Sequence, residues 1–170
     1  IYMTQLETLQ TNIEQWVVDR NLHTSDPNRQ VLKLIEEQGE LAGAIARGNR
    51  EKMIDSIGDV TVVALVITKQ LNASVDLWTA FERSTKYRDE KLDENAVIAA
   101  LAGDVAHLAS IICYKLHSKS YSYIENVITT LADVAATLDI DYIAAVQCAY
   151  DSIKDRKGQL VNGVFIKEGE

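Results

Sequence analysis

The sequence predicts an all-α protein, a helical bundle that forms a single domain over residues 1–170. Apolar residues recur at intervals of three and four along most of the chain, which is the spacing of one helical face. The chain has one proline and eight glycines. This is too few for a sandwich or barrel, which needs a turn about every 8–12 residues. With 47% hydrophobic and 25% charged residues, the composition is that of a folded globular domain.

Seven helices are expected, at about residues 4–21, 28–46, 51–71, 74–92, 95–116, 121–138 and 141–157. The first helix carries an apolar stripe that consists of Leu6, Leu9, Ile13, Trp16 and Val17. A loop at residues 23–28 follows, where Ser25 or Asp26 is expected to cap the second helix and Pro27 to occupy its first turn. Gly48 is expected to end that helix, because glycine tolerates the left-handed conformation of a C-terminal cap.

The third helix begins polar and becomes apolar on all sides after Asp59, which predicts a helix buried all round. Ile-Gly-Asp-Val at 57–60 resembles Leu-Ala-Asp-Val at 131–134, an echo that favours two related helical halves, and residues 76–137 are interpreted as an added or duplicated helical section. The alternative is that amphipathic helices simply look alike. The tail at 160–166 predicts a small hairpin or a segment that lies across a helix.

The charge and the apolar runs exclude several classes of partner. A net charge of −8 leaves no broad basic face for a nucleic-acid backbone. The longest apolar run, residues 60–67 with Thr61 as an interruption, is far shorter than the roughly 20 residues that span a bilayer. The first residues show no secretory signal. Cys113 and Cys148 are interpreted as reduced core thiols because both lie among apolar residues. We therefore expect a cytoplasmic protein that binds neither nucleic acid nor membrane.

Two acidic groups stand out, on the second and third helices. Glu36, Glu37 and Glu40 are expected opposite the apolar stripe of their helix, where they could simply form a solvated face. Asp55 and Asp59 follow one helical turn apart. Asp59 opens the apolar half of its helix, where a carboxylate without a partner is expensive.

The acids at this spacing favour a metal site. Glu37 with Glu40, and Ser56 with Asp59, are each three residues apart, so two packed helices would present oxygens to one point. The nearest bases, including Lys52, are not expected to share the face of Asp59. Oxygen ligands without histidine suit a hard cation such as Mg²⁺. A di-iron bundle would instead require Glu-x-x-His pairs.

The segment Gln-Val-Leu-Lys-Leu-Ile-Glu-Glu-Gln-Gly-Glu-Leu-Ala at 30–42, with Asp-Ser-Ile-Gly-Asp-Val at 55–60, resembles the MazG family. That family belongs to the all-α nucleoside triphosphate pyrophosphohydrolases, together with dimeric dUTPases and phosphoribosyl-ATP pyrophosphohydrolase. The C-terminal residues 149–167 resemble the ending of small phage-type and bacterial MazG-like proteins. The resemblance covers about residues 10–72 and 138–168.

The resemblance implies hydrolysis of an NTP or dNTP to the monophosphate and pyrophosphate, with Mg²⁺, or Mn²⁺, on Glu37, Glu40 and Asp59. Ser56 stands where the family has the glutamate of its ExxD motif, so one ligand is missing or is replaced by Asp55 or by a water bound to Ser56. A homo-oligomer, a dimer or tetramer, is also implied. The alternative is a catalytically inactive helical scaffold for oligomer or partner binding.

The resemblance also suggests roles for residues around the acids. Glu36 is expected to orient or deprotonate the attacking water. The expected phosphate clamp consists of Lys33, Lys154, Arg156 and Lys157. An alternative interpretation of Lys154, Arg156 and Lys157 is a basic final turn of the last helix, which the helix dipole favours. Trp16 either stacks on a nucleobase or packs in the core.

Overall fold

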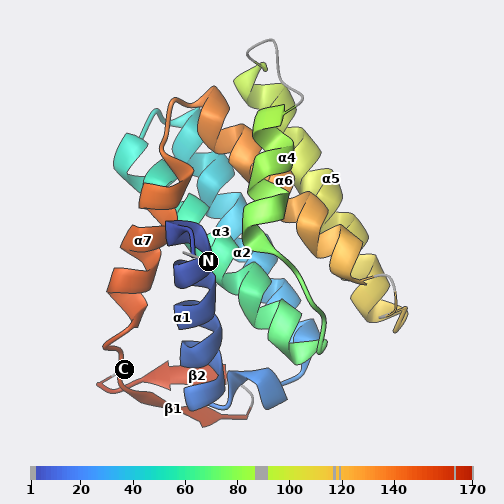
Figure 1. Ribbon diagram of the computed structural model, residues 1–170, viewed down its shortest axis with the longest axis vertical. Coiled ribbons are helices and arrows are strands. Elements are labelled where there is room, and N and C mark those ends of the chain that lie inside the picture. Colours follow the sequence, from blue (N-terminus) through green and yellow to red (C-terminus); the bar gives the residue numbers. More distant parts are fainter. Residues whose placement is uncertain (1–2, 87–91, 117, 119, 163, 170) are drawn as a thin grey trace.

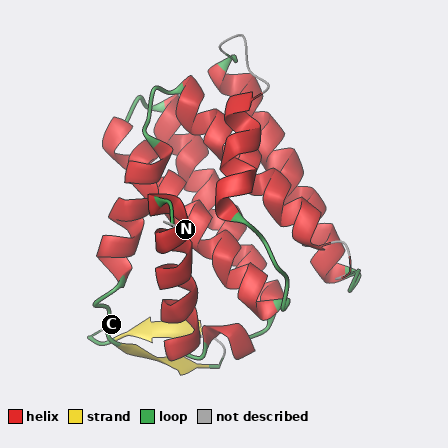
Figure 2. Cartoon of the chain, viewed as in Figure 1, coloured by secondary structure: helices red, strands yellow, loops and turns green. Residues whose placement is uncertain are grey.

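The computed structural model describes residues 3–86, 92–116, 118, 120–162 and 164–169, and within these ranges the protein is all-α apart from one small hairpin (Figures 1 and 2). The helices are α1 (Gln5–Asp19), α2 (Pro27–Ala46), α3 (Arg50–Gln70), α4 (Leu77–Lys86), α5 (Glu94–Cys113), α6 (Ser120–Thr137) and α7 (Tyr142–Ile153), with a short 3-10 helix, η1 (Leu22–Thr24). Strands β1 (Gly158–Val161) and β2 (Val164–Lys167) pair antiparallel. The predicted fold class is confirmed.

The helix starts follow the capping rules that the sequence contains. Thr4 and Glu7 form a capping box at α1, and Asp26 accepts a hydrogen bond from the amide of Asn28 at the start of α2. The predicted hairpin at the C-terminus is confirmed. The last helix ends at Ile153 rather than near residue 157. The expected helix at 74–92 begins later, at the start of α4, and residues 87–91 of that prediction lie outside the described residues.

Helix α3 is the central element and contacts α1, α2, α6 and α7 (Figure 1). Every described residue from Val60 to Thr68 is buried, so the predicted all-round burial is confirmed. The polar side chains inside this stretch are satisfied within the fold: Thr61 Oγ1 donates to the carbonyl of Ile57 at 3.0 Å and lies 2.9 Å from the hydroxyl of Tyr142 on α7. The core is therefore built around one helix that exposes almost none of its second half.

Helix ends recur at a constant interval along the chain. Caps or left-handed residues lie 67 residues apart in three pairs, Asp26 and Asp93, Gly48 and Lys115, and Asn72 and Asp139. The packing recurs as well, because α2 lies on α3 as α5 lies on α6, and α1 contacts α3 as α4 contacts α6. At this interval the counterpart of Asp59 is Asn126, not Asp133, so the sequence echo at 131–134 is out of register by two helical turns.

Helix α5 is, among the described helices, the one that is long and apolar enough by composition to cross a membrane. Apolar run counting missed it, because Asp104 and His107 interrupt the stretch. A third of its most apolar window is buried inside the bundle. In this fold α5 packs along α6 and α2.

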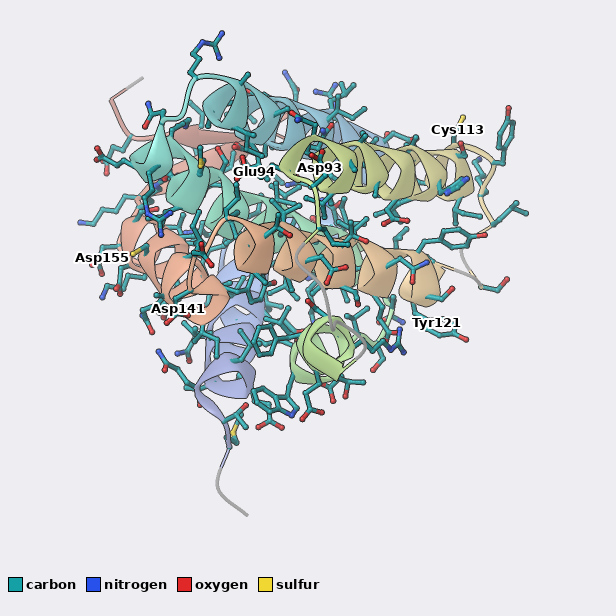
Figure 3. The ribbon with its side chains drawn as sticks, turned by 90° about the horizontal axis from the view of Figure 1, so that it is seen from above. Asp93, Glu94, Cys113, Tyr121, Asp141 and Asp155 are labelled. Atoms are coloured by element: carbon teal, nitrogen blue, oxygen red, sulfur yellow. The ribbon has the colours of Figure 1, made fainter. Side chains whose placement is uncertain are left out.

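The interpretation of the two cysteines as core thiols is wrong, because both are exposed. Cys113 lies at the outer end of α5 (Figure 3). The buried positions of α7 are Tyr142, Ala145, Val146, Ala149 and Ile153, and Cys148 falls on the other side of the helix. Apolar neighbours in the sequence did not identify the buried face, because alanine occurs on both sides of α7.

The close packing of α3 against α7 depends on Gly58. A Cβ at this position would collide with the carbonyl oxygen of Ala145 and lie 2.6 Å from the Cβ of Ala149. We expect Gly58→Ala to lower the free energy of unfolding by about 1–3 kcal/mol, because the two helices must separate. Gly103→Ala on α5 is the control, since among the described residues nothing lies within 4 Å of a Cβ there; it should gain about 0.5–1 kcal/mol. Thermal unfolding followed by circular dichroism measures both, and equal effects would contradict this packing role.

Candidate functional site

The α2–α3 hairpin places one acidic side chain inside the protein. Glu37 is 5% exposed and belongs to the buried face of α2 with Leu34 and Leu41. The expectation that all three glutamates lie opposite the apolar stripe is therefore wrong for Glu37, which lies one turn from each of those leucines. Glu36 is exposed and Glu40 is half-buried. On α3, Ser56 is fully buried and Asp59 is half-buried.

Two buried oxygens in this hairpin lack a hydrogen-bond partner anywhere in the described part of the chain. They are Glu37 Oε2 and Ser56 Oγ, and we refer to them as the two buried oxygens. A buried polar atom left unsatisfied costs roughly 1–3 kcal/mol, so native proteins rarely retain one without a ligand or a functional reason. These atoms lie on two helices that pack against each other. The site therefore offers oxygen ligands that the fold itself does not use.

Two lysines neutralise the acids from either side. Lys33 Nζ lies 2.7 Å from Glu37 Oε1 and 3.0 Å from Glu36 Oε2, all on α2. Burial alone would lower the pKa of Lys33, but hydrogen bonds to Glu37 and then Glu36 raise it overall. The remaining acids of the hairpin are neutralised differently, from α3.

Lys52 Nζ joins the two helices, 2.7 Å from Glu40 Oε2 on α2 and 3.0 Å from Asp55 Oδ2 on α3. These two hydrogen bonds raise the pKa of the Lys52 ammonium, with Glu40 contributing most. The sequence placed no role on Lys52. The sequence could have predicted its ion pair with Asp55, which lies three residues later on the same helix. Its contact with Glu40 depends on how α2 packs on α3.

The Asp59 carboxyl has an environment that opposes its charge. Burial, followed by the nearby carboxylates of Glu37 and Asp55, raises the pKa of Asp59 to about 6, while Arg156 and Lys52 act in the opposite direction. Asp59 is therefore electrostatically coupled to acids on both α2 and α3. It is also coupled to Arg156, which follows α7.

The residues fit a hard cation in donor chemistry. The hairpin offers carboxylate and hydroxyl oxygens, including the two buried oxygens, and such ligands suit Mg²⁺ or Mn²⁺. In the arrangement seen here, no three acidic, histidine or cysteine side chains among the described residues are gathered closely enough to hold one ion. Lys33 and Lys52 occupy carboxylate oxygens that a cation would use.

The predicted phosphate clamp is brought only partly to this site. Arg156 is close enough to Asp59 to lower its pKa, and its Nε donates to the carbonyl of Ser152 at 2.9 Å. Lys154 forms an exposed ion pair with Asp151 at 2.8 Å, and Lys157 is exposed directly before strand β1. Of these three residues, the structure links Arg156 most directly to the acids.

Two side chains at the end of α1 bind the segment that carries Arg156. Trp16 lies within α1, and Arg20 directly follows it. The indole Nε1 of Trp16 donates to the carbonyl of Ile153 at 2.9 Å, and the ring lies 6.1 Å from that of Phe165. The guanidinium of Arg20 lies 4.8 Å over the indole and donates to the carbonyl of Arg156 at 2.7 Å. Trp16 therefore packs within the protein, and the carbonyls bound by Arg20 follow the point where α7 ends.

Two open grooves flank the hairpin. One of about 410 Å³ is lined by Glu36, Gly39, Glu40, Gly43, Ala44, Arg47, Asn49 and Lys52. A second of about 450 Å³ is lined by Asn49, Glu51, Lys52, Ile54, Asp55 and Cys148. Lys52 and Asn49 line both grooves. The first groove combines carboxylates with a guanidinium and an ammonium, the groups that a metal–phosphate ligand requires.

Residues 26–92 match the family model of the MazG nucleotide pyrophosphohydrolase domain. This segment includes α2 and α3, which carry all of the predicted metal ligands, and the predicted resemblance to the MazG family is thereby confirmed. The chain is also 46% identical over 69 residues to an uncharacterized 18.2 kDa protein in the rep-hol intergenic region of Haemophilus phage HP1. That alignment covers 40% of this chain and 42% of the phage protein. No solved structure matches the chain.

The raised pKa of Asp59 predicts a stability change with a definite sign. The ordinary pKa is 3.8 and the folded value is about 6, so the folded protein loses stability as pH rises from about 4 to about 6. In chelator at pH 7.5, we expect Asp59→Asn to raise the free energy of unfolding by about 1–2 kcal/mol, because partial exposure screens part of the interaction. The gain should be largely lost by about pH 4 and vanish near pH 3, where aspartate is neutral in both states.

Asp55→Asn is the matched control for this measurement. Asp55 lies one turn from Asp59 but is paired with Lys52, so its neutralisation relieves repulsion at the cost of an ion pair and should bring a much smaller gain in stability than Asp59→Asn. Chemical denaturation of both variants between pH 4 and 8 gives the comparison. A gain for Asp59→Asn that does not depend on pH would show that its charge is not the cause.

Proposed function

We propose that the protein is an Mg²⁺-dependent nucleoside triphosphate pyrophosphohydrolase that converts an NTP or dNTP to the monophosphate and pyrophosphate. The observation that carries the proposal is the location of the two buried oxygens, Glu37 Oε2 and Ser56 Oγ, within the segment that matches the MazG nucleotide pyrophosphohydrolase domain. Unused oxygens in a buried position are what a metal centre requires before its ion binds.

Glu37, Glu40 and Asp59 would hold Mg²⁺, or Mn²⁺ in its place. Asp55 is the carboxylate nearest in sequence to Ser56, which replaces the expected glutamate, and it would complete the set. When bound, the cation would neutralise phosphate oxygens and the charge that develops as a phosphoanhydride breaks. The raised pKa of Asp59, caused first by burial and then by the carboxylates of Glu37 and Asp55, is consistent with this role, because an added positive charge would stabilise the ionised carboxyl.

The chain's own residues would handle the water and the phosphates. Glu36 is exposed and lines the groove of about 410 Å³. It would accept a proton from a water that attacks phosphorus. The new phosphorus–oxygen bond yields the monophosphate, and the anhydride oxygen leaves with pyrophosphate. Lys33 and Arg156 would pair with phosphate oxygens, with Lys154 and Lys157 farther along the same C-terminal segment.

The proposal also covers the location of the protein in the cell, its partners and its oligomeric state. A net charge of −8 supports a cytoplasmic protein that binds free nucleotides rather than a nucleic acid or a membrane surface. The proposal also includes a homo-oligomer, a dimer or tetramer, which is what the resemblance to the MazG family implies.

Incubation of the protein with a panel of NTPs and dNTPs tests the activity. We expect one or more substrates to give the monophosphate and pyrophosphate with Mg²⁺ or Mn²⁺, and no turnover with chelator. Release of orthophosphate with a diphosphate would contradict the proposal, since a different bond is then broken. Cation binding without turnover on any nucleotide would favour the alternative of an inactive scaffold, which the serine at position 56 makes the second candidate.

Neutral variants of the acids test their assignment. Glu37→Gln, Glu40→Gln and Asp59→Asn should each reduce metal-dependent turnover by at least about 100-fold, because each removes a charged ligand while helix content remains. Glu94→Gln at the start of α5 is the control and should retain full activity. Product formation and Mn²⁺-induced thermal stabilisation are measured together. If turnover is lost but Mn²⁺ stabilises the variants as strongly as the parent, these acids are not the ligands.

A further inference from the structure

Lys52 is the side chain that closes the acidic hairpin across its two helices. Its ammonium contacts Glu40 on α2 at 2.7 Å and Asp55 on α3 at 3.0 Å. Lys33, in contrast, contacts only residues of its own helix in the ion pairs seen here. A divalent cation that binds Glu40 on α2 and Asp55 on α3 would therefore compete directly with the Lys52 ammonium for these two carboxylates.

The surroundings of Lys52 give its ammonium an alternative place. Lys52 lines both grooves, and Arg47 lines the first of them. The side chain is 41% exposed, so an ammonium released from the carboxylates would have open space toward the groove that it lines. In that position it would face the same volume as Arg47, where phosphate oxygens have two cationic partners.

The two buried oxygens show that this cluster is more than a solvated acidic surface. Glu37 is 5% exposed and Ser56 is fully buried, and their oxygens lie on the two helices that Lys52 joins. The acids beside them are neutralised in the metal-free protein by an ammonium from α3. The acids thus receive their charge balance from the protein itself, and two buried oxygens have no partner in the fold.

We propose that Lys52 is the built-in counter-cation of the hairpin, which a divalent cation displaces from Glu40 and Asp55, and whose freed ammonium then faces nucleotide phosphates in the groove beside Arg47. This inference rests on the proposed function, because it requires that the hairpin binds a divalent cation. It assigns a role to a residue that neither the sequence nor the family match places in the site.

Mn²⁺ binding to the full chain tests this role, with free Mn²⁺ measured by electron paramagnetic resonance. Lys52→Gln should bind Mn²⁺ about tenfold more tightly than the parent, because the cation no longer displaces an ion pair. Arg47→Gln is the matched control. It removes the same charge from the same groove, but the guanidinium of Arg47 donates to the carbonyl of Gly43, and its affinity should change by less than about twofold. Lys52→Arg should bind Mn²⁺ within about threefold of the parent.

Thermal unfolding supplies a readout that is independent of activity. In chelator, Lys52→Gln should unfold about 2–4 °C below the parent, because Glu40 and Asp55 lose the cation that they share. Saturating Mn²⁺ should erase this deficit, since the ion then neutralises the same carboxylates. Arg47→Gln should show the same small change with and without Mn²⁺.

The outcomes separate this inference from the proposed function. If the parent binds Mn²⁺ and hydrolyses nucleotides but Lys52→Gln and Arg47→Gln shift the Mn²⁺ affinity equally, only general electrostatics is at work and the role of Lys52 is overturned. An unchanged melting temperature for Lys52→Gln in chelator overturns it as well. If the parent binds no Mn²⁺, the proposed function fails first, and the displacement fails with it.

Discussion

The burial of Glu37 between α2 and α3 is the constraint on which the site depends. A carboxylate that is 5% exposed is stable only if its charge is balanced. Lys33 balances one of its oxygens, and the other, with the hydroxyl of Ser56, is left for a ligand. Replacing Glu37 by an apolar residue would make a more ordinary helix interface. The chain instead keeps a buried charge, with one unpaired oxygen, at the place where we propose that a cation binds.

Helix α3 connects the fold to this site through two adjacent residues. Gly58 permits the close approach of α7, and Asp59 lies among the acids of the hairpin. Because α7 lies on α3, the segment after it arrives near Asp59 and carries Arg156. Trp16 and Arg20 then fix that segment through hydrogen bonds to its backbone carbonyls. The packing of α7 is thus part of the geometry of the site.

Periodicity and capping predicted most of the fold, because each helix has a buried face and a local signal at its start. Asp26 and Pro27 illustrate this at α2. The same reasoning placed Glu37 in the candidate site but on the wrong side of its helix, because its charge was taken to exclude it from the apolar stripe although it lies one turn from both Leu34 and Leu41. Lys52 was missed because its contact with Glu40 depends on the packing of two helices, which no single-helix pattern contains. The exposure of Cys148 was missed for a related reason, as a small-residue helix has no evident buried face.

Anomalous diffraction from crystals of the protein grown with Mn²⁺ tests the central claim most directly. The account predicts one strong peak between α2 and α3, with carboxylate oxygens of Glu37 and Asp59 within about 2–2.5 Å of the ion, and with Lys52 turned away from Glu40. A peak elsewhere on the surface, or an ordered hairpin with Lys52 still bound to Glu40 and Asp55 in saturating Mn²⁺, would contradict it.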